Sequence, residues 1–246
     1  MSDYDYGGWP EYVSVAEHKR RALKKLNALR ERGQKCEPIA LQGRQIAATF
    51  WGKAWCEHLE TYSDYANRLP RGRSYVRNGS VLDLQISEGK VISQVSGSDL
   101  YRIHIQIRSL DPKKWKKIIN TCAGKIDSLI ELLQGNLSQS VMEILTDRDQ
   151  GMFPSPQQIS LKCSCPDYAG MCKHVAATLY GVGSRLDHKP ELLFVLRGVK
   201  KEDLLTAGTR MSALSNKAGP TKRSALKGQD LSKLFDIELA KEPVSN

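Results

Sequence analysis

The sequence predicts an α+β fold, in which an antiparallel sheet of three or more strands packs with helices and is joined by a small ββα-like finger. Three features support this class. Apolar and polar residues alternate over residues 81–107, and apolar residues recur at helical spacing before and after that stretch. Three cysteines and a histidine also fall within the twelve residues 163–174.

The N-terminal half predicts two helices followed by the sheet. Leucines recur at helical spacing within residues 14–32, and Gly33 ends that helix. In residues 49–66 two tryptophans, Trp51 and Trp55, share one helix face and are expected to anchor the core. The next segment, residues 69–77, combines three arginines with Pro, Gly and Tyr.

Three strands are expected next, at residues 81–86, 90–96 and 100–107, with turns of the hairpin type between them. One face of this sheet is apolar and the other polar, as in an antiparallel sheet with one wetted side. His104 falls on the polar face and is interpreted as an exposed sheet residue.

Helices are expected again after the sheet. Asp111 and Pro112 are suited to begin one, and residues 125–133 and 138–147 predict two more. The lysines around Trp115 are either a solvated first turn or contacts to phosphate. Near the end of the finger region we expect two short helices, at 190–196 and 201–205, with Asp187 and Asp203 as helix-start residues.

The most informative segment is a Cys-x-Cys pair followed, after six residues, by Cys-x-His. In an extended chain residues i and i+2 point to the same side, so Cys163 and Cys165 can direct both sulfurs to one point. The sequence after His174 is helical, so Cys172 must precede or begin the helix, with His174 just inside it. Four such ligands predict a closed tetrahedral zinc site with a structural role.

Three other interpretations explain this segment less well. Buried unreactive cysteines do not explain the clustering. A thiol redox pair formed by Cys163 and Cys165 leaves Cys172 and His174 unexplained, and redox motifs more often have the spacing Cys-x-x-Cys. A catalytic zinc keeps an open coordination position, whereas four protein ligands close the shell.

With these residues in place, the chain resembles the bacterial SWIM-type zinc finger proteins. Cys163, Cys165, Cys172 and His174 match the motif, and the resemblance extends over roughly residues 9–205 through stretches such as TFWGKAWCEHLE, LPRGRSYVRNG and GMFPSP. The resemblance implies zinc as cofactor and DNA or protein as the interaction partner. It also implies a Swi/Snf-like helicase as a possible partner, because such proteins often accompany these enzymes in bacteria.

Charge indicates the same class of partner. The formal net charge is +10, from 37 Lys and Arg against 27 Asp and Glu, and residues 18–35 alone carry eight bases and one acid. Excess positive charge favours an anionic partner, most often nucleic acid. The basic helix is either solvated or lies on phosphates or on a partner.

We expect four regions along the chain. They are an N-terminal arm with the basic helix (1–48), an α/β core (49–150), the zinc finger with its following helices (151–205) and a flexible basic tail (206–246). Within the tail, residues 230–240 form a short amphipathic segment that either docks on a partner or frays.

Composition excludes several classes of protein. No apolar run reaches the roughly 20 residues of a membrane helix, and the N-terminus lacks the pattern of a secretory signal. Six cysteines are too sparse for a disulfide scaffold, which predicts a cytoplasmic location. We therefore expect no membrane partner.

The leading hypothesis is a non-enzymatic, zinc-stabilised protein that binds nucleic acid, most often DNA, as an accessory of a helicase. No phosphate-binding loop, nucleophile elbow or paired carboxylates are found. The alternative is a protein-interaction scaffold without direct nucleic-acid binding. Candidate phosphate contacts are Arg71, Arg73, Arg77, Lys113, Lys114 and Lys173.

Overall fold

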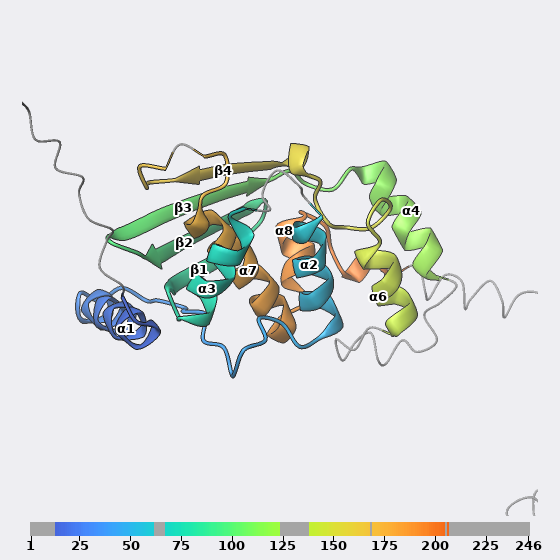
Figure 1. Cartoon of the computed structure of the whole chain (residues 1–246). Coiled ribbons are helices and arrows are strands. Elements are labelled where there is room, and N and C mark those ends of the chain that lie inside the picture. Colours follow the sequence, from blue (N-terminus) through green and yellow to red (C-terminus); the bar gives the residue numbers. More distant parts are fainter. Residues whose placement is uncertain (1–12, 62–66, 124–137, 168, 205, 207–246) are drawn as a thin grey trace, which may run out of the picture. The chain divides into compact units, whose positions relative to one another are not determined.

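Four antiparallel strands form one sheet in the order β1-β2-β3-β4 (Figure 1). The strands are β1 (Val81–Ser87), β2 (Lys90–Ser96), β3 (Leu100–Ile107) and β4 (Ile159–Cys163). The first three confirm the predicted strands, with β2 and β3 at the predicted bounds. β4 returns from a distant part of the chain to pair with β3, with Leu161 opposite Ile105.

The structure is a computed structural model that describes residues 13–61, 67–123, 138–167, 169–204 and 206. One compact unit extends from Met1 to Thr209, and a second consists of residues 210–246. The second unit, the helix predicted at 125–133 and the amphipathic segment at 230–240 lie outside the described residues.

Seven α-helices are described around the sheet. Among the described residues, no helix combines the length and the apolar character needed to cross a bilayer. The helices are α1 (Val15–Glu31), α2 (Phe50–Glu60), α3 (Leu69–Arg77), α4 (Pro112–Ala123), α6 (Gln139–Thr146), α7 (Lys173–His188) and α8 (Leu192–Leu196), and a short 3₁₀ turn covers Pro156–Gln158.

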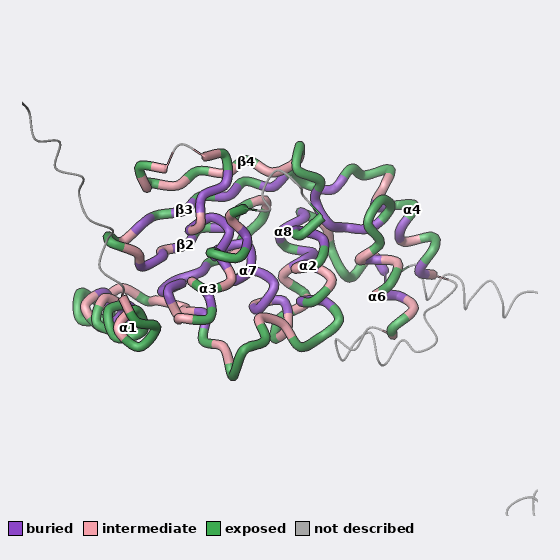
Figure 2. The backbone as a smooth tube through the Cα atoms, viewed as in Figure 1, coloured by how far each residue is buried: buried purple, intermediate pink, exposed green. Residues whose placement is uncertain are grey.

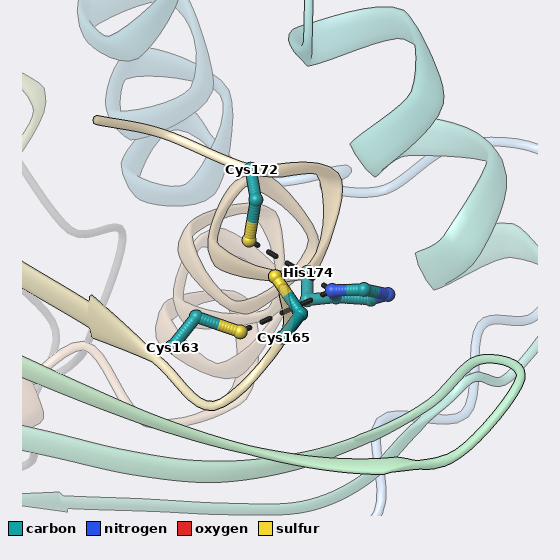
Figure 3. Close-up of side chains that lie close together, drawn as sticks. All are labelled: Cys163, Cys165, Cys172 and His174. Carbon is teal, nitrogen blue, oxygen red and sulfur yellow. Dashed lines mark hydrogen bonds between the residues drawn. The ribbon is translucent and has the colours of Figure 1, made fainter. Parts of the chain in front are cut away.

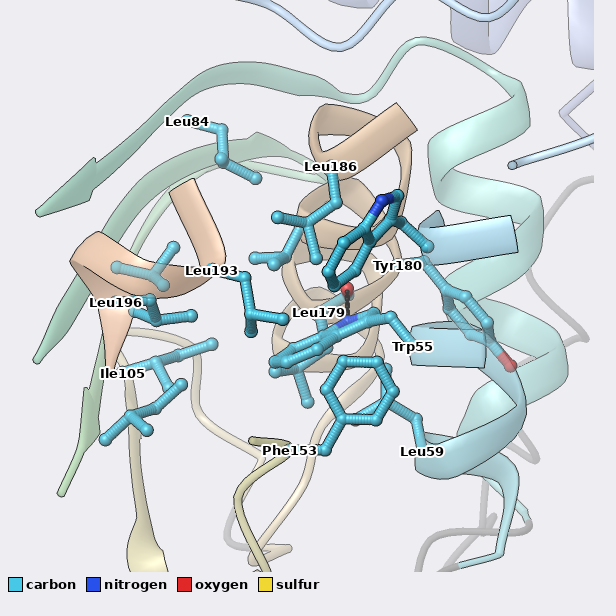
Figure 4. Close-up of a cluster of buried hydrophobic side chains, with 14 of the residues drawn as sticks. Trp55, Leu59, Leu84, Ile105, Phe153, Leu179, Tyr180, Leu186, Leu193 and Leu196 are labelled. Atoms are coloured by element: carbon cyan, nitrogen blue, oxygen red, sulfur yellow. Dashed lines mark hydrogen bonds between the residues drawn. The ribbon is translucent and has the colours of Figure 1, made fainter. Parts of the chain in front are cut away.

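The core lies between the sheet and α7, which is buried along most of its length. Figure 2 shows this burial, and every residue of α7 from His174 to Ser184 is buried. Trp55 of α2 is fully buried against α7 and donates from Nε1 to the carbonyl oxygen of Leu179 at 2.9 Å (Figure 4). The ring of Phe153 packs edge-on to Trp55 at 5.5 Å, which confirms this tryptophan as a core anchor.

Small residues allow α2 and α3 to approach α7 closely. A Cβ placed on Gly72 of α3 would lie 2.5 Å from the Cβ of Ala176 and 2.9 Å from the α7 backbone. A Cβ placed on Gly183 of α7 would lie 2.8 Å from the sulfur of Cys56 in α2. The close contact explains why a segment containing Gly72 folds as a helix: packing outweighs the weak helix propensity of glycine.

One predicted role is wrong. Asp187 does not begin a helix but lies in the last turn of α7, where its carboxylate accepts hydrogen bonds from the backbone N–H groups of Ala48 and Thr49. Thr49 is the N-cap residue of α2, so the carboxylate anchors the chain just before this helix to the end of α7. Asp203 accepts a hydrogen bond from Nε1 of Trp115 at 2.9 Å.

The N-terminal helix α1 has a small core of its own. Ala22, Leu26 and Leu29 pack with Leu82 of β1, and Leu100 at the start of β3 is partly buried against them. Nζ of Lys25 donates to the carbonyl oxygens of Gly97 and Ser98 in the β2–β3 turn, at 3.0 and 3.3 Å.

The finger and the sheet share a core. β4 belongs to the same sheet as β1–β3, and Cys172, Val175 and Leu179 lie in the same buried cluster as Val81 and Ile105. The predicted boundaries near residues 48, 150 and 205 stay predictions. Because α7 and the sheet share this buried cluster, we expect a substitution that displaces α7 to destabilise the sheet as well.

Replacing Gly72 with alanine is expected to destabilise the protein. The added methyl group overpacks the α3–α7 contact at a cost of roughly 1–3 kcal/mol, which exceeds the gain of up to about 1 kcal/mol in helix propensity. Urea unfolding monitored by tryptophan fluorescence measures the difference. The control is Ser74→Ala on the exposed side of α3, which is expected to stay within about 0.5 kcal/mol of wild type. Equal stability of the two variants would contradict the close contact.

Candidate metal centre

Three sulfurs and one imidazole converge where β4 ends and α7 begins (Figure 3). Cys163 is the last residue of β4, and Cys165 follows it in the loop. Cys172 is the N-cap of α7, and His174 is the second residue of that helix. The four ligand atoms lie within 4.8 Å of one another, and all four belong to the sequence motif.

Local backbone geometry explains the convergence. Cys172 has an extended conformation, with φ −85° and ψ 169°, and the helix starts at Lys173. Within a helix, residues i and i+2 point in divergent directions. The change from extended to helical backbone between Cys172 and His174 removes that divergence, as the sequence predicts.

The distances fit a tetrahedral zinc ion. The Nδ1 atom of His174 lies 3.9 Å from the sulfur of Cys163 and 3.8 Å from that of Cys172. Bonds of about 2.3 Å to sulfur and about 2.0–2.1 Å to nitrogen place two tetrahedral ligands about 3.6 Å apart. The donor set therefore needs only small adjustments to hold zinc, with Nδ1 as the nitrogen ligand.

The thiols are electrostatically unequal. A hydrogen bond from Cys163, together with those from His174 and the Val175 backbone, lowers the pKa of Cys172 to about 3 against the opposing effect of burial. The same interaction with Cys172, with burial, raises the pKa of Cys163. The pKa shifts have opposite signs because two adjacent thiolates in a partly buried site repel each other. A divalent cation removes that repulsion and allows all three thiolates to form.

Two tyrosines hold the imidazole in place. The ring of Tyr101 stacks on His174 at 4.2 Å, and the ring of Tyr75 in α3 contacts it edge-on at 5.3 Å. Among the described residues none forms a hydrogen bond with the buried Nε2 atom. Aromatic packing therefore sets the ring orientation. Many other metal-bound histidines are instead oriented by a hydrogen bond that their second ring nitrogen donates.

Gly97 in the β2–β3 turn closes this pocket around His174. A Cβ at this position would lie 2.8 Å from the Tyr101 ring and 3.0 Å from Nε2 of His174. The sequence places Gly97 in a turn and Tyr101 on the apolar face, but it gives no signal that both contact the metal-binding histidine. That contact depends on the pairing of distant segments.

The structure brings only some of the predicted phosphate contacts together. Lys173 is half-buried, and its Nζ lies 5.4 Å from the centre of the Tyr75 ring in α3, as a cation–π contact. Arg71 and Arg77 are exposed on α3, and Arg77 donates from Nε to the carbonyl oxygen of Arg44 at 3.0 Å. Arg73 is less available to phosphate, because it forms a 2.6 Å ion pair with Glu60.

Lys113 and Lys114 lie elsewhere. Both are in the first turn of α4, on the opposite side of the view from α3 (Figure 1). Burial lowers the pKa of Lys114, which is half-exposed. The six predicted residues therefore do not form one surface.

Loss of a zinc ligand is expected to destabilise the whole described unit. Cys172→Ser should reduce the zinc content well below one ion per chain and lower the melting temperature, because zinc at about 1,000 times its Kd contributes about 4 kcal/mol to the folded state. Elemental analysis and thermal unfolding, each with and without a chelator, measure both effects. Ser164→Ala, between two ligands, is the control. A variant that retains one zinc ion would refute the role of Cys172.

A methyl group at Gly97 is expected to weaken zinc binding without removing a ligand. Gly97→Ala displaces Tyr101 or His174, so zinc should be lost to a competing chelator at a concentration severalfold lower than for wild type. Gly170→Ala is the matched control, because a Cβ at this finger position meets nothing within 4 Å. Equal zinc retention by both variants would show that the aromatic packing does not position the histidine.

Comparisons with known proteins agree with this geometry. The family profile of the SWIM zinc finger matches residues 152–181, which include all four ligands. A protein of Mycobacterium tuberculosis (strain ATCC 25618 / H37Rv), the uncharacterized protein Rv2102, is 37% identical over 163 residues. The matched region is 65% of this chain and 58% of the relative, so the chain spans somewhat more than half the length of that protein.

The comparison with solved structures gave no significant match. The zinc site thus stands on the sequence motif, the family profile and the arrangement of the donors. SWIM zinc fingers are zinc-binding modules, commonly used in nucleic-acid or protein interaction. Residues 152–181 of this chain form a SWIM zinc finger.

Proposed function

We propose that the protein is a non-enzymatic, zinc-stabilised module that binds nucleic acid, with DNA as the main target. The observation that carries this proposal is the position of Lys173 between two zinc ligands and against α3. Metal binding would fix the backbone on both sides of this lysine, and its ammonium group lies over the ring of Tyr75 in α3, the helix that carries the exposed Arg71 and Arg77.

The binding surface that we propose is formed by α3 and the first turn of α7. Leu69, Gly72 and Val76 are buried against α7, which leaves the opposite side of α3 exposed. We define the α3 surface as the exposed Arg71, Ser74 and Arg77 of α3 together with the half-buried Lys173 at the start of α7. Arginine, lysine and serine side chains are typical donors to phosphate oxygens, and contacts of this kind fix orientation without reading sequence.

Zinc has a structural role in this proposal. Three thiolates and an imidazole complete a tetrahedral shell and leave no position for water or substrate. The ion would stabilise the junction between β4 and α7, while the lysine and arginines bind the ligand. The absence of a catalytic motif in the sequence supports a non-enzymatic role.

Two further elements belong to the proposal. A Swi/Snf-like helicase is the proposed protein partner, and the support for it is the resemblance to SWIM proteins. The proposed location is the cytoplasm, because thiolate ligands remain available to zinc only where they are kept reduced.

The proposal predicts a defined salt dependence. Removing two phosphate contacts with Arg71→Gln and Lys173→Gln should weaken binding to a labelled 20-base-pair duplex by about tenfold or more at about 100 mM salt, and the slope of log K against log salt should become about 2 units less steep. Fluorescence anisotropy over a salt series measures both quantities. The control is the pair Lys189→Gln and Lys200→Gln, which removes the same charge from exposed positions away from α3.

Equal effects of the two pairs would mean that only net charge matters. If the wild-type protein binds neither duplex nor single strand at about 50 mM salt, the nucleic-acid proposal is rejected. The remaining function would then be a scaffold that binds an acidic protein.

A further inference from the structure

The face of the sheet turned away from α7 is open along β2, β3 and β4. In β3, Ile103 and Ile105 are fully buried on the inner side, while Arg102, His104 and Gln106 are exposed on the outer side. Strand pairing places His104 between two neighbours on this face: Ile92 of β2, which is 36% exposed, and Lys162 of β4. This outer face is not covered by the helices that bury the inner one.

Basic side chains follow one another along this face. Successive outward positions on a strand are about 7 Å apart. Starting from Arg102, one step along β3 reaches His104, which pairs with Lys162, and the next reaches Gln106, which pairs with Lys90. A further step of two residues leads to the exposed Arg108. We call these four cations the cationic track: Arg102, Lys162, Lys90 and Arg108.

Acidic groups do not neutralise the track from within the face. Among the outward positions of the four strands the only carboxylate is that of Asp83, which is 6% exposed. It accepts hydrogen bonds from the backbone of Glu37 and from the side chain of Gln85, each at 2.9 Å. The acids nearest in sequence, Glu88 and Asp99, belong to the two hairpin turns.

The basic helix α1 adjoins one end of the track. It packs on Leu82 and Leu100, and Leu100 lies two residues before Arg102 on β3. Lys25 fixes α1 to the neighbouring turn through Gly97 and Ser98. The region with eight bases and one acid therefore continues the positive charge of the sheet face.

The chemistry of the face favours nucleic acid over protein. Ile92 is the one apolar side chain at the exposed outward strand positions, and no Trp, Tyr or Phe accompanies it there. Protein interfaces bury an apolar core enriched in aromatic residues, whereas nucleic-acid interfaces are polar and strongly positive. Tyr101 of β3 is buried on the inner side, and the outer face exposes no Trp, Tyr or Phe ring for base stacking, so contact would be with phosphates.

We propose that the cationic track and α1 form a second nucleic-acid surface, which binds the phosphate backbone without reading sequence. This inference rests on the proposed function, but it uses residues on the other side of the sheet from α3. A nucleic acid held at both surfaces would contact the protein around the sheet edge formed by β4, where the zinc site lies.

The test replaces the four cations of the track by glutamine: Lys90→Gln, Arg102→Gln, Arg108→Gln and Lys162→Gln. A matched control removes four exposed charges outside the strands: Lys116→Gln, Lys189→Gln, Lys200→Gln and Lys201→Gln. Binding to a 20-base-pair duplex and to a 20-nucleotide single strand is measured by anisotropy over a salt series. Zinc content and melting temperature confirm that both variants fold.

The track variant should bind at least tenfold more weakly than the control at about 100 mM salt, with a log K–log salt slope that is about 2 units or more less steep for duplex. Whichever of the two probes the wild-type protein binds more tightly, duplex or single strand, is the form of nucleic acid that the protein prefers. Equal losses in track and control variants would overturn the inference. If only the Arg71→Gln and Lys173→Gln pair loses affinity, the proposed function stands and the track is rejected. If the wild-type protein binds neither probe, the track is not a nucleic-acid surface. Polyglutamate serves as an acidic protein-like probe. A track variant that loses binding to polyglutamate but retains both nucleic acids would also overturn the inference.

Discussion

The position of α7 depends on how the chain enters it, and that entry is set by the converging ligands. Cys163 ends a strand of the sheet, while Cys172 and His174 begin the helix that fills the core. Zinc connects the two points through bonds much stronger than any single contact in the surrounding protein. Everything that packs on α7, including α2, α3 and the inner sheet face, is arranged relative to this junction.

The site is embedded in packing that leaves little room for variation. Aromatic rings from α3 and β3 enclose the imidazole, and glycine at position 97 is the residue that fits between the turn and the ring. Gly72 and Gly183 allow helices to approach α7 at backbone distance. The same elements that hold the metal ligand therefore carry the exposed arginines of α3. The positions of these arginines therefore depend on the close helix contacts that the glycines allow.

Local features of this fold could be predicted from the sequence, and long-range ones could not. The alternation of apolar and polar residues predicted β2 and β3 at their observed bounds. The spacing of Cys172 and His174 predicted a helix that starts between them, and α7 starts at Lys173. The partner of β4 was not predictable, because pairing across about 50 residues leaves no periodic trace. The contact of Asp187 with the chain before α2 was missed for the same reason. The helix α3 was obscured by Pro70 and Gly72, which are residues that usually interrupt helices.

The spacing of the ligands has a consequence for the order in which the molecule assembles. All four lie within twelve residues, so zinc closes a short loop, and the entropic cost of that closure is small. Pairing β4 with β3 instead requires chain segments about 50 residues apart to meet. Metal capture can therefore come first, and it would present β4 and the first turn of α7 already joined when the β1–β3 meander arrives. Zinc supply in the cell would then influence the rate of folding as well as the stability of the folded protein.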